Sequence, residues 1–167
     1  IEHMFENNPG SIEKVLSCGT LGEIFLLAKG YKLGKKTEEF LKKKGFLSFL
    51  EQAKKLLEKY EYEIELPKDV AFEKNGKRKE ISVKKLPVNE MLLDIGEKTA
   101  NEYANIIKKA RTVVVKGPAG VYEKKGFEIG TKILLKAIAD SKAFSLIGGG
   151  DTLVAIEKLG IDKNKFS

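Results

Sequence analysis

The strongest constraint on the fold is a run of three glycines that joins an apolar segment to a helical pattern within residues 144–155. The segment reads Phe-Ser-Leu-Ile-Gly-Gly-Gly-Asp-Thr-Leu-Val-Ala, which predicts a buried strand that turns sharply into a helix. Glycines let a ligand approach the backbone, and the first N–H groups of a helix lack partners, so this junction favours an anion. Asp151 adds a hard carboxylate of the kind that Mg2+ prefers when it also binds phosphates.

A purely structural interpretation of the same turn is also open. In that interpretation Asp151 or Thr152 only caps the helix, and the turn binds nothing. Because a glycine-rich turn before a helix is a weak signal by itself, the remaining segments have to decide between the two interpretations.

Strand and helix patterns alternate four times along the chain. Strand-like runs occur at residues 13–18, 91–95, 112–115 and 144–147, and helical stripes occur at 24–28, 35–60, 99–110, 127–141 and 153–155. Residues 64–67 resemble the end of a strand, and residues 70–83 alternate around Asn75-Gly76, which predicts a hairpin. The alternation predicts an α/β fold: a three-layer, Rossmann-like domain with a mostly parallel sheet and helices on both faces.

Four glycine-containing turns follow the predicted strands. They lie at residues 18–22, 94–96, 116–123 and 148–152. Ligands of open parallel sheets bind beyond the carboxyl ends of the strands, so we expect these four turns to share one rim and to form one binding crevice.

Composition narrows the classes of partner. With 167 residues, of which 42% are hydrophobic, the chain can bury one core, and it has no apolar run long enough for a membrane span and no signal-peptide pattern. The net charge of +7 invites a nucleic-acid partner, yet Arg78 and Arg111 are the only arginines, so a solvated lysine-rich surface is favoured over base recognition. The single cysteine, Cys18, fits a reducing cytoplasm.

Two other kinds of site are disfavoured. Residues 30–37 resemble a P-loop, but only three residues separate the glycines, a second lysine precedes Thr37, and the segment follows a helix. His3 is the only histidine, so the chain offers neither a Cys/His nor a Ser/His pair, and no histidine-rich metal cluster.

Three motifs, in this order and spacing, make the chain resemble phosphoglycerate kinases. That family has a strand ending in Asn-Gly-Pro-Met/Ala-Gly-Val-Phe-Glu, a helix opening with Phe-x-x-Gly-Thr, and a strand running into Gly-Gly-Gly-Asp-Ser/Thr. The corresponding residues here are 117–123, 127–131 and 148–152. Further landmarks are Cys18-Gly19, residues 25–30, 66–69 and 94–96, and Thr99, so the resemblance covers essentially the whole chain and is greatest to archaeal members.

The resemblance implies that residues 1–167 are the nucleotide-binding, C-terminal domain of a two-domain kinase, and that this domain is incomplete at both ends. Such an enzyme moves a phosphoryl group between 1,3-bisphosphoglycerate and ADP, giving 3-phosphoglycerate and ATP, with Mg2+. By the same resemblance, Glu123 binds the ribose hydroxyls and Pro118 packs near the sugar or base. Gly19 and Gly96 form the floor of the slot that binds adenine. The backbones of Gly149 and Gly150 contact the phosphates at the catalytic centre, with Asp151 on Mg2+ and Thr152 on a phosphate oxygen.

The chain departs from the family pattern at several points. Lys116 replaces the family's Asn, so that its ammonium either lies near the phosphates or points away, and Cys18 replaces a glycine. The family's Gly-Gly-Ala-Lys loop and the N-terminal domain that binds phosphoglycerate are absent from these residues. We therefore expect the 167 residues to bind Mg-nucleotide weakly without turnover. The alternative is a non-catalytic nucleotide-binding module of similar fold.

Overall fold

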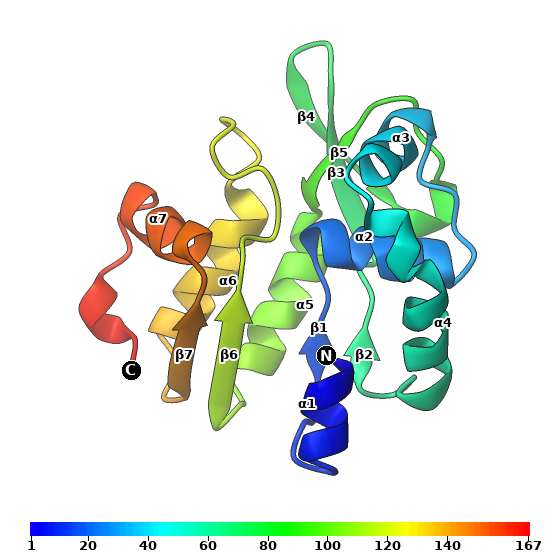
Figure 1. Ribbon diagram of the computed structural model, residues 1–167. Coiled ribbons are helices and arrows are strands. Elements are labelled where there is room, and N and C mark those ends of the chain that lie inside the picture. The colour runs from blue at the N-terminus through cyan, green and yellow to red at the C-terminus, as the bar shows by residue number, and fades with distance from the viewer.

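The computed structural model describes residues 1–167, and its helices and strands alternate as the sequence predicts (Figure 1). The strands are β1 (Val15–Leu16), β2 (Ile64–Glu65), β3 (Asp69–Lys74), β4 (Lys77–Ser82), β5 (Leu92–Ile95), β6 (Thr112–Lys116) and β7 (Phe144–Gly148). The α-helices are α1 (Glu2–Asn7), α2 (Gly19–Ala28), α3 (Lys35–Lys43), α4 (Leu50–Lys59), α5 (Glu97–Ile107), α6 (Ile129–Ala139) and α7 (Gly150–Lys158). Short 3-10 helices are η1 (Phe46–Phe49), η2 (Val83–Lys85) and η3 (Lys163–Lys165).

Two pairs of strands are parallel, as expected. β1 pairs with β2 through Val15 and Ile64, and β6 pairs with β7 from Thr112–Phe144 to Lys116–Gly148. The two pairs are separate two-stranded sheets. Parallel strands need long crossover connections, and these are provided by α2 to α4 between β1 and β2 and by α6 between β6 and β7.

The strand at residues 92–95 corrects one expectation. We expected it in the parallel sheet, but β5 runs antiparallel to β3 in a three-stranded sheet of order β4-β3-β5. The first four residues of β3 are buried, so the backbone groups on both of its edges need partners. The predicted hairpin, whose turn has Asn75 at φ 53° and Gly76 at φ 71°, supplies one edge, and β5 supplies the other.

Helices cover both faces of the β1–β2 pair. Val15 packs against a cluster formed by α2, α4 and Ile64, whereas Leu16 points to the opposite side, toward a cluster that includes α5 and α6. The Tyr103 hydroxyl of α5 lies 3.0 Å from the Ser17 carbonyl oxygen on that side. This part of the molecule is therefore three-layered, as predicted.

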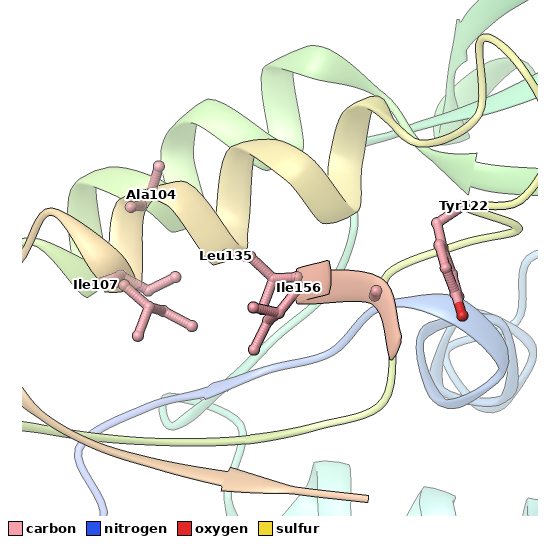
Figure 2. Close-up of a cluster of buried hydrophobic side chains, with 8 residues drawn as sticks. Ala104, Ile107, Tyr122, Leu135 and Ile156 are labelled. Carbon is pink, nitrogen blue, oxygen red and sulfur yellow. The ribbon is translucent and has the colours of Figure 1, made fainter. Parts of the chain in front are cut away.

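The β6–β7 pair is covered on one face only. Val113 and Val115 pack against the cluster of α5, α6 and α7, in which Leu135 and Ile156 point toward each other (Figure 2). On the other face Val114 is 55% exposed and Leu146 is 53% exposed. This packing fixes the beginning of α7 relative to the ends of β6 and β7.

The N-terminus of α5 is capped by a side chain from another strand. The N–H groups of Lys98 and Thr99 donate to the Asp69 carboxylate at 3.2 and 2.8 Å. A Cβ atom on Gly96 would lie 2.1 Å from the Asp69 carboxyl carbon, so residue 96 has to be glycine for the cap to form. The cap ties α5 to β3 and, through it, to the hairpin.

Replacing Asp69 with alanine is expected to lower the free energy of unfolding by about 2 kcal/mol, because one buried and one partly buried helix N–H group lose their acceptor. Chemical denaturation followed by circular dichroism measures the change. Asp162→Ala, which removes an exposed cap from η3, is the control and should cost less than about 0.5 kcal/mol. Equal losses in the two variants would contradict the role given to Asp69.

Candidate functional site

A cavity of about 360 Å³ lies where α2, β5 and the loop after β6 meet. Its wall includes residues 18–21, 91–95 and 116–121, which come from three of the four predicted glycine turns and from the strand that precedes one of them. More than half of the lining residues are hydrophobic. A mostly apolar hollow with a few polar groups is the usual form of a small-molecule site.

The wall formed by α2 requires a close approach between two backbones. Gly19, the first residue of α2, has φ 54°, and a Cβ atom there would lie 3.3 Å from the Pro118 carbonyl oxygen. Glycine therefore lets the loop after β6 pack directly on the beginning of α2. The structure brings Gly19 and Pro118 together in the cavity wall, as the sequence led us to expect.

The loop after β6 is anchored by hydrogen bonds to β5 and α6. The Val121 N–H donates to the Leu93 carbonyl of β5 at 2.7 Å, and the Ala119 N–H donates to the Thr131 hydroxyl of α6 at 3.0 Å. A Cβ atom on Gly120 would lie 2.4 Å from the Leu93 carbonyl oxygen, which leaves room only for glycine. The loop is therefore held rigidly against β5.

Asp94 forms a buried anchor beneath the cavity. Its carboxylate accepts hydrogen bonds from the Arg78 guanidinium at 2.9 Å and from the Gly130 N–H at 2.8 Å. Arg78 also donates to the carbonyl oxygens of Ile95 and Gly126. Burial raises the pKa of Asp94 to about 6, although the Gly130 N–H and the Arg78 charge act in the opposite direction. One signal of this pair is visible in the sequence: an arginine in a hairpin whose other basic residues are lysines.

Thr152 has a different role from the one expected. Its hydroxyl is fully buried, donates to the Gly148 carbonyl at 2.7 Å and accepts from the Gly117 N–H at 2.8 Å. With both bonds made inside the protein, the hydroxyl is not free for a phosphate oxygen. Thr152 instead joins the two glycine-rich turns, which fixes the separation between the ends of β6 and β7.

Gly96 also lies outside the expected place. It is buried against the Asp69 carboxylate and does not line the cavity, so it cannot floor a base slot there. The reason is that Gly96 begins a helix whose capping residue occupies the space beside it. The cavity is lined instead by Met91, Leu92 and Leu93. The sequence analysis did not identify these residues as part of the site, because their apolar run was assigned to the core of the sheet.

The two predicted acidic ligands both act on the same side chain, Tyr122. Burial and the charges of Glu123 and Asp151 raise the pKa of Tyr122. Both acidic residues are exposed, and neither forms part of the cavity wall. They reach the rim from the loop after β6 and from the first turn of α7.

The turn before α7 is open to an incoming anion. Gly149 has φ 86°, and a Cβ atom on Gly150 would have no neighbour within 4 Å. The Lys116 Cγ atom lies 3.9 Å from the position of a Cβ atom on Gly149, so the lysine stem runs beside the turn.

The polar side chains of the site suit a metal ion that is coordinated partly by the protein and partly by phosphates. No group of three or more His, Cys, Asp or Glu side chains is arranged to hold a metal by itself. Asp151, exposed in the first turn of α7, supplies a single hard carboxylate, which fits Mg2+ bound chiefly to phosphate oxygens and water. The Cys18 thiol in the cavity wall is a poor metal ligand, because burial raises its pKa to about 12.

None of the helices in the structure combines the length and the apolar character needed to cross a membrane.

Comparison with known proteins agrees with this geometry. A family model described as phosphoglycerate kinase matches residues 1–167. Phosphoglycerate kinase from Methanobacterium bryantii is 42% identical over 161 residues, which cover 96% of this chain and 39% of the relative. The crystal structure of phosphoglycerate kinase from Pyrococcus horikoshii OT3 is similar with a TM-score of 0.83 and 42% identity, over 89% of this chain and 38% of that one. The enzyme from Coxiella burnetii has a TM-score of 0.83 and 31% identity, over 99% and 42% of the two chains. The chain thus spans less than half the length of these relatives, and it belongs to the phosphoglycerate kinase family.

Proposed function

We propose that this chain forms the ADP/ATP site of a phosphoglycerate kinase, which transfers a phosphoryl group between 1,3-bisphosphoglycerate and ADP. The observation that carries the proposal is the position of the apolar cavity beside the glycine turn that begins α7, with Lys116 in the wall of the cavity and next to the turn. A nucleotide has the same two parts, a flat apolar base and a string of anionic phosphates.

The cavity is the proposed site of the base. Leu93 and Pro118 line it together with Gly19, whose lack of a side chain leaves room for a flat ring. The base then lies between the beginning of α2 and β5, with the loop after β6 closing the slot. Glu123, which follows this loop and is exposed, is the proposed partner of the ribose hydroxyls.

The beginning of α7 is the proposed site of the phosphates. Gly149 and Gly150 present backbone N–H groups there, and the helix dipole favours negative charge at the same end. Asp151 is the proposed ligand of Mg2+, which supplies the positive charge that screens the transferring phosphoryl group. Lys116, whose stem lies beside Gly149, is proposed to add a further positive charge. Phosphoryl transfer depends mainly on such positioning and charge neutralisation, which rigid backbone groups provide without reorganisation.

The partner substrate, 1,3-bisphosphoglycerate or 3-phosphoglycerate, is proposed to reach this rim from a second domain with a basic surface. Closure of two domains would then exclude water from the transfer. In this proposal the present chain holds the nucleotide, and the enzyme acts in the cytoplasm.

The Glu123→Ala, Asp151→Ala double variant is expected to bind Mg-ADP about 10- to 100-fold more weakly, because it loses hydrogen bonds to a charged group and a ligand of the ion. Titration calorimetry measures the affinity. Both side chains are exposed, so the fold should persist. Glu157→Gln removes one charge further along α7 and should leave the affinity unchanged. An affinity equal to that of the wild type in the double variant would show that the site is wrongly placed.

Lys116→Ala is expected to weaken Mg-ADP binding about fivefold to tenfold and to reduce its dependence on salt, because one phosphate-facing cation is lost. Adenosine, which lacks phosphates, should bind equally well to both proteins. Lys142→Ala removes an exposed lysine at the opposite end of β7 and serves as the control. A comparable loss of adenosine affinity would instead indicate that Lys116 supports the cavity wall.

A further inference from the structure

We propose that the Glu23 side chain selects the base in this cavity, by hydrogen bonding to its edge in a way that favours adenine over guanine. This inference rests on the proposed function, since it concerns the base of the nucleotide that the cavity would hold. It gives a role to a residue that neither the motifs nor the anchoring hydrogen bonds involve.

Glu23 lines the cavity from the second turn of α2. The following residues Ile24 and Phe25 are buried in the core, whereas Glu23 is partly buried and lines the cavity together with Cys18 and Leu93. A charged side chain in a mostly apolar wall is unusual, because transfer of a carboxylate out of water is costly unless donors replace the water.

Glu23 has no such donors. The two buried aspartates show the usual solution: Asp69 accepts from two N–H groups of α5, and Asp94 accepts from Arg78 and from Gly130. The Glu23 carboxyl makes no hydrogen bond or ion pair in the protein, and burial alone raises its pKa to about 8. At neutral pH it is therefore mainly an uncharged acid, with one donor and one acceptor, in the wall of the cavity.

The other titratable groups around the cavity do not offset the effect of burial on the pKa of Glu23. Asp94 is paired with Arg78, the Lys116 stem lies beside Gly149, and the Cys18 thiol is neutral because its pKa is about 12. The residues of α4 that pack against α2 are apolar. The state of Glu23 thus depends on the apolar wall, and a base that fills the cavity would exclude more water and favour the neutral acid further.

The neutral acid matches adenine. A protonated carboxyl offers one O–H donor beside one acceptor oxygen, and adenine presents an N–H donor beside a ring-nitrogen acceptor. The ionised carboxylate offers acceptors only, which match the two adjacent N–H donors of guanine. Preference for adenine should therefore be strong below the pKa of Glu23 and should fall as the pH rises through about 8.

The test compares Mg-ADP with Mg-GDP by titration calorimetry at about pH 6.5 and about pH 8.8, a range that spans the titration of Glu23. Both ligands carry the same diphosphate, so the ratio of their affinities cancels the titration of the phosphates and of Lys116. For the wild-type chain we expect the ADP preference to fall by about 10-fold between the two pH values. Glu23→Gln keeps a donor and an acceptor but does not titrate, so its ADP preference should be equal at both. Glu23→Leu should lose most of the preference at both.

Circular dichroism melting of each variant shows whether it is folded. A wild-type ADP preference that does not change with pH, or one that survives in Glu23→Leu, would overturn the inference while leaving the nucleotide site in place. If the folded wild-type chain bound neither nucleotide, the proposed function would fail, and this inference with it.

Discussion

The buried carboxylate of Asp94 is the group on which the geometry of the cavity depends. It joins Arg78 of β4, the Ile95 N–H of β5 and the Gly130 N–H at the beginning of α6, so one charge connects the antiparallel sheet to the helix behind the loop after β6. A buried carboxylate without such donors would cost several kcal/mol, so the three elements can be displaced from one another only at a large cost. Leu93, the preceding residue, holds the loop itself through the Val121 N–H.

Side-chain hydrogen bonds hold the loops in place, as backbone hydrogen bonds hold the strands within each sheet. The ladder between β6 and β7 ends at Lys116 and Gly148, so no strand pairing holds the loop that follows β6. Thr131 and Thr152 hold it instead, each through a buried hydroxyl bonded to a loop N–H. These contacts are short and directional, and they give the rim the rigidity that a site for positioned phosphates needs.

Much of the site could be predicted from glycine positions, because a glycine that permits a close backbone approach is visible in the sequence as a break in an apolar pattern. Gly19 beside Pro118, and Gly149 before α7, lie where that reasoning put them. The same reasoning failed for Gly96 and Thr152, because residues distant in sequence surround them. The Asp69 carboxylate of β3 fills the space beside Gly96, and the Gly117 N–H of the loop after β6 donates to the Thr152 hydroxyl. Glu23 was missed because, in a helical pattern, a lone glutamate resembles a solvated surface residue.

The sequence by itself determined the alternation of strands and helices, the Asn75-Gly76 hairpin and the turn at the beginning of α7, because these depend on backbone preferences and periodicity over a few residues. Only the tertiary structure decided that β5 pairs with the hairpin instead of joining the parallel strands, and that Asp94 and Arg78 meet beneath the cavity. These outcomes depend on which buried edges and charges find partners across the fold. That matching involves groups from the whole chain at once, and no local pattern records it.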